Sequence, residues 1–177
     1  MADPEDADRD GISGRINWVP DLRKDELAPG RFGWKAEQPT VAQQVASAFS
    51  GDIGITTPMM PNASCAELQT VCAEVESGGE PEIDARIFER LEVYTQAIAV
   101  PIRRGWNTET IRRGKRLFQL AGCDNCHRAS YVTGESSSLA ELNNQKFWPY
   151  TDLLLLDMGE DLADNRPSYS ANGREWR

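Results

Sequence analysis

The chain has 177 residues, enough for one sizeable hydrophobic core or two small ones. It carries 28 acidic and 19 basic residues, a formal net charge of -9, and no basic run, which makes binding to nucleic acids or anionic membranes improbable. Its longest strongly apolar run is the four leucines 153–156, far short of a membrane span.

The N-terminus is acidic and polar, so no signal peptide is predicted there. Asp6, Asp8, Asp10 and Gly11 fall at the first, third, fifth and sixth positions of a calcium loop. Asn17 occupies the twelfth position in place of a bidentate glutamate, so such a site would be weak or non-standard. The alternative interpretation is a solvated acidic turn.

Residues 16–37 are punctuated by proline and glycine and are expected to be loop-like. Three amphipathic helices are predicted after them, from Pro39 to about Phe49, from Glu82 to Val100, and from about Thr108 to Leu120. Gly114 in the apolar face of the third predicts close approach of another backbone.

Cys65 and Cys72 lie seven positions apart, beyond the spacing of a metal knuckle. In an oxidising compartment a local disulfide is the expected state of such a pair. The alternative is two free, buried thiols.

The residues 123–127 read Cys-Asp-Asn-Cys-His, the attachment signal of a c-type haem. On a helical turn, Cys123 and Cys126 can each form a thioether with a porphyrin vinyl group. His127, the single histidine of the chain, then supplies the proximal ligand to the iron. The sequence therefore predicts a covalently bound haem c.

Three other interpretations of this motif agree less well with the sequence. A thioredoxin-like pair follows a β-strand, whereas a helix is predicted before Cys123. A zinc site needs about four nitrogen or sulfur ligands, and only Cys65 and Cys72 remain. A plain disulfide would leave the histidine unused.

The sixth iron ligand is expected from the segment that follows a polar loop at 131–138 and a short helix at 139–145. Met158 is the single methionine after the haem motif, behind an aromatic and leucine-rich stretch, residues 147–156, that can wall a hydrophobic pocket. An open site, Lys146 or Met60 are the alternatives.

Several stretches together resemble the di-haem oxidoreductase family, bacterial relatives of di-haem cytochrome c peroxidases that are also labelled thiol oxidoreductase-like. The matching stretches run nearly end to end along the chain: residues 6–15 (DADRDGISGR), 30–36 (GRFGWKA), 51–56 (GDIGIT), 121–127 (AGCDNCH), 149–155 (PYTDLLL), 157–159 (DMG) and 173–177 (GREWR). The resemblance implies electron transfer and peroxide chemistry.

The chain departs from the family pattern in two ways. Family members usually carry a second C-x-x-C-H upstream and continue past Gly-Arg-Glu-Trp-Arg, so this sequence is expected to be a middle-to-C-terminal portion with one of two haems. A two-haem reaction is then incomplete on this chain alone. Leu156 also stands where the family often has histidine, which removes any acid–base or ligand role of that side chain.

The sequence thus predicts a mostly α protein, with a loop-rich and helical extension at 1–101 and a cytochrome c-like haem domain at 102–177. The expected function is single-electron transfer by a six-coordinate haem, with a redox partner or a second haem domain. Covalent haem attachment normally occurs outside the cytoplasm, so an exported, periplasmic protein is expected. Its acidic surface suits a small basic electron carrier.

Two rival functions remain open. A peroxidase with an open distal site would need an acid–base group near the iron, and Glu135, Asp152 and Asp157 are the local candidates. A calcium-stabilised structural module would use the haem only as a cross-link that stabilises the fold.

Overall fold

The computed structural model describes residues 2–135 and 139–177, so the last residues of the predicted loop at 131–138 lie outside the described part. In this part the chain forms three α-helices, α1 (Val41–Asp52), α2 (Ala85–Ala97) and α3 (Glu109–Leu120). Only 28% of the residues are helical and 13% lie in small antiparallel sheets. The expectation of a mostly α, cytochrome c-like fold is therefore wrong, although the three long helices were predicted within a few residues.

Three two-stranded antiparallel sheets account for the strands of the described residues. β1 (Trp18–Asp21) pairs with β2 (Glu26–Pro29) in a hairpin within the segment expected to be loop. β3 (Tyr131–Val132) pairs with β4 (Lys146–Phe147), and β5 (Leu156–Asp157) pairs with β6 (Glu175–Trp176). Short 3-10 helices occur at η1 (Cys72–Glu74), η2 (Cys123–Asn125), η3 (Ala140–Leu142) and η4 (Glu160–Leu162).

The chain after His127 is extended for a local chemical reason. Short polar side chains accept hydrogen bonds from backbone N–H groups two residues ahead of them, which holds turns in place of helix. These pairs are Thr151 with Leu153, Asp152 with Leu154, Asp157 with Gly159, Asp164 with Arg166, and Asn172 with Arg174. The helix expected at 139–145 is reduced to η3, because the carbonyl of Leu142 and the N–H of Gln145 bond the hydroxyl of Thr133.

A hydrophobic core lies between α1 and α2. Both helices begin at side-chain caps, where Thr40 accepts from the N–H of Gln43 and Asp84 accepts from that of Ile87. Their apolar faces meet in a cluster of buried residues: Ala42, Val45, Ala46, Ile83 and Phe88. Met59 and Met60 pack against this cluster, so both thioethers belong to the core.

A second, largely polar cluster joins the N-terminal segment to the C-terminal one. Arg15 pairs with Glu175 through two hydrogen bonds, and its backbone exchanges two further bonds with Leu155, which is fully buried. Asn17, also fully buried, donates to the carbonyls of Lys35 and Ser168. The bonds to Leu155, Ser168 and Glu175 hold residues about 140–160 positions apart in the sequence side by side.

Lys35 adds a buried charge to this cluster. Its ammonium group bonds Asp164 and the carbonyl of Asn172, and it lies 4.5 Å from the ring centre of Trp176. The charge is thus paired and hydrogen-bonded, which is the condition for burying it.

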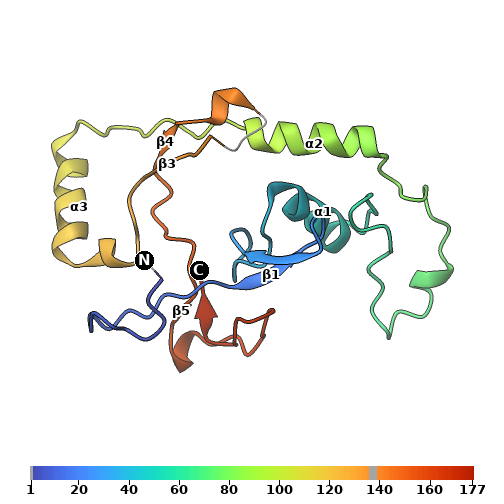
Figure 1. Ribbon diagram of the computed structural model, residues 1–177, viewed down its shortest axis with the longest axis horizontal. Helices are drawn as coiled ribbons and strands as arrows, with labels where there is room; N and C mark the ends of the chain where they lie inside the picture. The colour runs from blue at the N-terminus through green and yellow to red at the C-terminus, as the bar shows by residue number, and fades with distance from the viewer. Residues whose placement is uncertain (1, 136–138) are drawn as a thin grey trace.

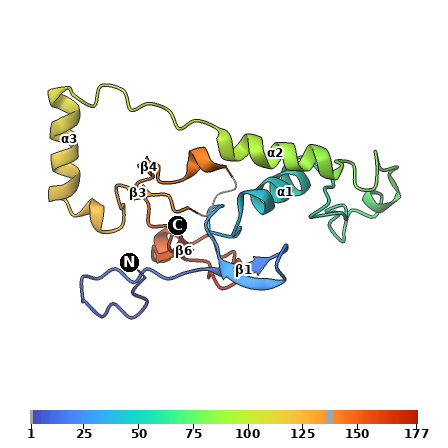
Figure 2. The same cartoon turned by 45° about the horizontal axis from the view of Figure 1, so that its top comes forward.

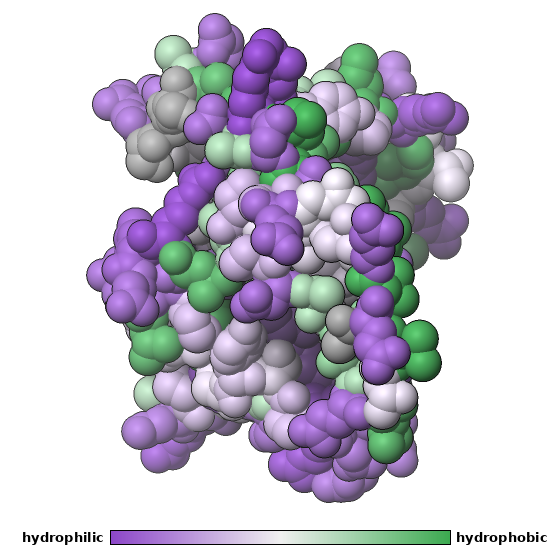
Figure 3. Space-filling view, turned by 90° about the vertical axis from the view of Figure 1, so that its right-hand side faces the viewer, coloured by the Kyte–Doolittle hydropathy of each residue, from purple (hydrophilic) through white to green (hydrophobic). Residues whose placement is uncertain are grey.

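Helix α3 stands at one end of the molecule, away from α1 and α2, and an extended segment connects it to α2 (Figures 1 and 2). None of its residues is buried, and apart from the helix's own backbone no described atom beyond the neighbouring residues lies within 4 Å of the Cβ position of Gly114. The close backbone approach predicted at Gly114 is therefore not found among the described residues. At the opposite end, hydrophilic residues cover much of the surface and hydrophobic ones form scattered groups (Figure 3). No helix in the described part is long and apolar enough to cross a membrane.

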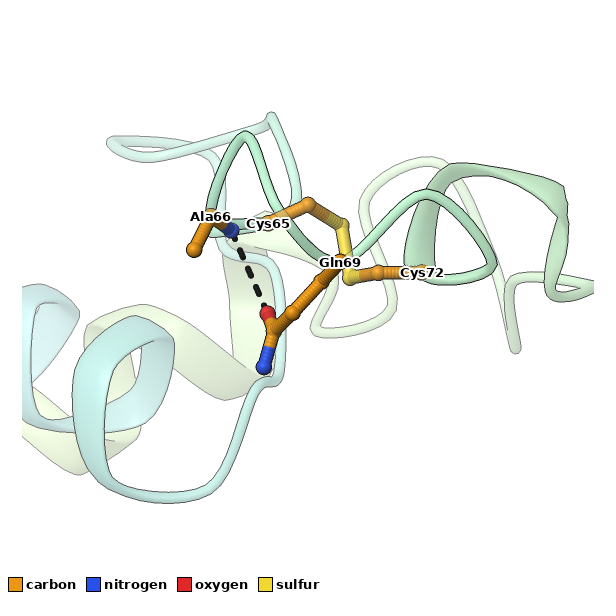
Figure 4. The surroundings of a disulfide bond; sticks show 4 residues. All are labelled: Cys65, Ala66, Gln69 and Cys72. Carbon is orange, nitrogen blue, oxygen red and sulfur yellow. Dashed lines mark hydrogen bonds between the residues drawn. A yellow bond between two sulfur atoms is a disulfide. The ribbon is translucent and has the colours of Figure 1, made fainter.

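Cys65 and Cys72 form a disulfide whose Cα atoms are 5.7 Å apart. The bridge closes a loop in which the N–H of Ala66 donates to Oε1 of Gln69 (Figure 4). The loop is mostly exposed and lies beyond the α1–α2 core.

The disulfide is expected to act locally and independently of the haem motif. Replacing Cys65 and Cys72 by serine should lower the free energy of unfolding by at most about 2.5 kcal/mol, the chain-entropy value for so short a loop. The visible spectrum of the haem-loaded protein should not change. Peptide mass spectrometry without reduction should recover one cross-link between the two cysteines, and alkylation of both in exported protein would contradict the bridge.

The ion pair of Arg15 with Glu175 should make stability depend on acid. Burial alone would raise the pKa of Glu175, but hydrogen bonds from Arg15 and from the N–H of Asn172 outweigh it and lower that pKa. The contribution is therefore complete above about pH 4.3, the ordinary glutamate value, and is lost as the pH falls through the lower folded-state pKa.

Because only 8% of the Glu175 side chain is exposed, Glu175→Gln should lower the free energy of unfolding at pH 7 by about 3–5 kcal/mol and flatten its acid dependence. Glu160→Gln is the control, since that side chain is 80% exposed in its pair with Arg174 and should cost less than about 1 kcal/mol. Urea unfolding between pH 3 and pH 7 measures both. Equal effects of the two changes would contradict the assigned role of Glu175.

Candidate haem-binding site

The Cys-Asp-Asn-Cys-His motif forms a single tight turn directly after α3. The helix ends at Ala121, and Gly122 adopts a φ of 74°, a left-handed conformation that glycine enters without steric cost. The N–H groups of Cys126 and His127 both bond the carbonyl of Cys123. One turn therefore carries both thiols and the imidazole. It is called here the haem turn (residues 123–127).

The thiols of the haem turn are not joined to each other. Cys123 and Cys126 are free and half-buried, whereas Cys65 and Cys72 are bridged. Burial raises the pKa of the Cys126 thiol, and the charge of Asp152 raises it further. A plain disulfide is thus not formed, and the element before the turn is a helix, unlike the strand that precedes a thioredoxin-type pair.

A metal knuckle is also not assembled here. Among the described residues, the single group of potential ligands close enough to hold a metal ion consists of three aspartates, and it contains neither His127 nor a cysteine. A zinc site would need about four nitrogen or sulfur ligands at one point. The donor set of the haem turn, two thiols and an imidazole, fits haem c.

His127 is oriented by the backbone of Tyr150. Its Nδ1 lies 2.9 Å from the carbonyl oxygen of Tyr150, and because a carbonyl only accepts, Nδ1 carries the proton. The unprotonated nitrogen is then Nε2, which keeps its lone pair for an iron ligand bond. Such a bond from the far ring nitrogen to a carbonyl is the usual support of a metal-bound histidine.

Aromatic rings pack beside the imidazole. The ring of Phe118, on α3, lies 5.9 Å from that of His127 and 5.9 Å from that of Tyr150, which it meets edge-on. Phe147, also expected to cover the haem, stacks instead on Tyr131, and Trp148 is 57% exposed. Only part of the predicted aromatic wall therefore adjoins the histidine.

The structure carries Met158 on a different element from the haem turn. It directly follows β5, its N–H donates to the carbonyl of Arg174, and the residue is 45% exposed. Of the alternatives, Met60 packs on the α1–α2 core, and the ammonium group of Lys146 lies over the ring of Trp148.

The three acids considered for a distal role have different surroundings. Glu135 accepts from the side-chain amide of Asn144, and Asp157 pairs with Arg174. Asp152 lies close enough to the haem turn for its charge to raise the pKa of Cys126, and it lines a cleft with Asp124 and Asn125. Asp152 is thus the acid of the three that adjoins the motif.

The acidic loop at the N-terminus brings together Asp3, Asp6 and Asp8, with one carboxylate oxygen of each within 4.8 Å of the others. Asp10, expected as the third ligand, instead accepts from the N–H of Ile12 and lines the cleft shared with Asp124. Much of the loop is held by its own hydrogen bonds, such as those from Ala7 to Asp3 and from Gly11 to Asp6.

The sequence did not reveal three parts of this site. The carbonyl of Tyr150 could not be identified because a backbone oxygen carries no residue-type signal. Phe118 lies on the third predicted helix, but its contact with His127 depends on how Gly122 turns the chain. Arg103, which donates to the hydroxyl of Tyr150, had no distinguishing signal in the sequence.

The chain was compared with known proteins in three ways. Comparisons with curated proteins and with solved structures gave no significant match. A family model described as "Di-haem oxidoreductase, putative peroxidase" matches residues 1–177, the whole of the sequence. The chain therefore belongs to the di-haem oxidoreductase family.

Proposed function

We propose that this chain binds one haem c covalently and passes single electrons through it. The observation that carries the proposal is the bond between Nδ1 of His127 and the carbonyl of Tyr150, because it prepares the other ring nitrogen for iron. The family match supports a haem-containing oxidoreductase and leaves open whether the chain transfers electrons or reduces peroxide.

Each residue of the site has a defined task in this proposal. Cys123 and Cys126 would hold the porphyrin through thioether bonds, and His127 would bind iron through Nε2. The bound haem supplies a reversible one-electron couple. The Tyr150 carbonyl limits rotation of the imidazole and makes it a stronger ligand, while the ring of Phe118 packs beside the imidazole, which is otherwise exposed.

Met158 is proposed as the sixth ligand. A thioether is the ordinary partner of histidine in electron-transfer cytochromes, and a filled sixth position excludes substrate from the iron. Met59 and Met60 pack against the α1–α2 core. Among the methionines of the described residues, this leaves Met158 as the candidate ligand. Met158, directly after β5, would then hold the haem iron together with His127.

The family description supports peroxide reduction as a second candidate function. It would need an open iron site and a nearby acid–base group, for which Asp152 is the best placed of the acids considered. A second haem domain or another redox protein would then supply electrons. Export to the periplasm accompanies either function, since haem c attachment and the Cys65–Cys72 disulfide both suit an oxidising compartment.

We also propose that the acidic loop binds calcium. The carboxylates of Asp3, Asp6 and Asp8 converge closely enough to share one hard cation, which prefers oxygen ligands. The same loop lines the cleft beside the haem turn, so a cation there would stabilise the surroundings of the haem.

Covalent attachment predicts that acid–acetone extraction leaves the haem on the polypeptide. Cys123→Ser with Cys126→Ser should release it, because both thioether bonds are lost. Cys65→Ser with Cys72→Ser removes the same number of cysteines and should retain all of it. If the haem of wild-type protein matured in a periplasm is extracted completely, the attachment is contradicted.

Met158→Ala should convert a low-spin haem to a high-spin one that binds carbon monoxide or peroxide. Met60→Leu is the control, since it conserves core volume and should leave the spectrum unchanged. Optical and electron paramagnetic resonance spectra report both. A wild-type protein that is already high-spin and binds these ligands would favour the peroxidase function over the electron carrier.

Calcium binding predicts that chelation lowers the melting temperature of the haem-loaded protein by about 5 °C. Asp8→Ala should abolish this sensitivity because it removes one of the three converging carboxylates. Asp161→Ala removes an exposed carboxylate outside the loop and should preserve it. Superimposable melting curves with and without chelator would refute the site.

A further inference from the structure

Positive charge is concentrated in one part of this acidic chain. Residues 102–120 contain six of its 19 basic residues and one of its 28 acidic residues, Glu109. The segment thus carries a formal charge of +5, and the other residues, 13 basic and 27 acidic, carry -14. The six cations, called here the cationic segment, are Arg103, Arg104, Arg112, Arg113, Lys115 and Arg116.

The cationic segment is exposed and largely unpaired. All six residues are exposed, and none forms an ion pair with a residue in the described part of the chain. Arg103 makes a hydrogen bond, to the hydroxyl of Tyr150, the residue whose carbonyl orients His127. These charges are therefore available to a partner. One of them, Arg103, contacts Tyr150, and Tyr150 in turn contacts His127, the proposed haem ligand.

Three arginines of α3 lie on the face of the helix away from Phe118. At 100° per residue, Arg112, Arg113 and Arg116 lie about 120–160° around the helix from Phe118, whereas Lys115 lies about 60° from it. Because Phe118 lies against His127, these three arginines, called here the cationic face of α3, lie on the side of the helix away from that contact.

The like charges on α3 destabilise the helix, and a need for solubility does not explain why they are there. Like charges at positions i and i+4, such as Arg112 and Arg116, destabilise a helix by a few tenths of a kcal/mol per pair. A net charge of -9 already keeps the chain in solution, and these cations reduce it. Their concentration beside the haem turn is more readily explained by a partner of opposite charge.

We propose that the cationic face of α3 is the docking surface for an acidic redox protein that exchanges electrons with the haem turn. This inference rests on the proposed electron-transfer function and specifies its partner by charge. It also reverses the partner expected from net charge alone, because the local field at the point of contact, rather than the total charge, steers association.

A protein partner fits this surface better than an anionic membrane. The acidic loop adjoins the haem turn, where Asp3, Asp8 and Asp10 line a cleft with Asp124. The loop and α3 lie at the same end of the molecule in both views (Figures 1 and 2). A flat anionic surface laid on α3 would also approach this loop and be repelled, whereas a protein of limited footprint can contact α3 alone.

The test uses the reduced, haem-loaded protein and two oxidants of opposite charge, anionic ferricyanide and cationic tris(phenanthroline)cobalt(III), over a range of ionic strength. If docking at α3 dominates, the ferricyanide rate falls as salt is added. A protein that reacts through its net charge of -9 would show the reverse, a ferricyanide rate that rises with salt, and that result overturns the inference.

Two charge reversals make the test site-specific. Arg112→Glu with Arg116→Glu alters the cationic face, and Arg86→Glu with Arg90→Glu makes the same charge change at the same spacing on the exposed face of α2. At low ionic strength the α3 variant should lose about tenfold in ferricyanide rate, and the α2 variant should lose much less. Equal losses would show a net-charge effect and overturn the inference.

Direct binding provides the second readout. Calorimetric titration with an acidic plant-type [2Fe–2S] ferredoxin should show binding that the α3 variant loses and the α2 variant keeps, and it requires no haem. Retained binding by the α3 variant overturns the inference, as does α3-dependent cosedimentation with phosphatidylglycerol vesicles. Absence of covalent haem would instead contradict the proposed function, and the ferredoxin titration would still decide whether α3 is the docking surface.

Discussion

The ion pair between Arg15 and Glu175 is the contact on which the arrangement of the site depends. It fastens the N-terminal segment of the chain to the C-terminal one, and the backbone bonds between Arg15 and Leu155 lie beside it. Leu155 is fully buried and follows Tyr150 by five residues, so anchoring it also limits where the Tyr150 carbonyl can lie. The orientation of His127 is therefore linked through the backbone to a salt bridge between the two ends of the sequence.

The molecule combines two kinds of interior. Between α1 and α2 it is hydrophobic and built from residues near one another in sequence, whereas the cluster around Asn17, Lys35 and Glu175 is polar and joins distant segments. A buried charge pair contributes little net stability but is costly to break, so this cluster mainly enforces one arrangement of the chain ends. The haem turn lies between these interiors and α3, where few side chains are buried.

Charge is distributed unevenly around the haem turn, and this bears on how an electron carrier would use it. The acidic loop and Asp152 line a cleft beside the haem turn, and the exposed cations of α3 directly precede the turn in the chain. An oriented field of this kind favours one docking geometry over others and accelerates encounter with a partner of suitable charge. Total charge describes solubility well and describes the contact surface poorly.

Local patterns in the sequence determined the haem motif, the three long helices and the Cys65–Cys72 pairing, because spacing, caps and periodicity act over a few residues. The fold class, the β1–β2 hairpin and the grouping of Asp3 with Asp6 and Asp8 were not obtained from it. The fold class depends on Asx and Thr turns after His127 and on contacts between residues more than a hundred positions apart. The hairpin and the aspartate grouping are local, but they depend on backbone pairing and on hydrogen bonds such as that from the N–H of Ala7 to Asp3, which residue types alone do not specify. The tertiary structure alone decided which carbonyl faces His127, since every residue carries the same backbone oxygen and only folding places one of them beside the ring.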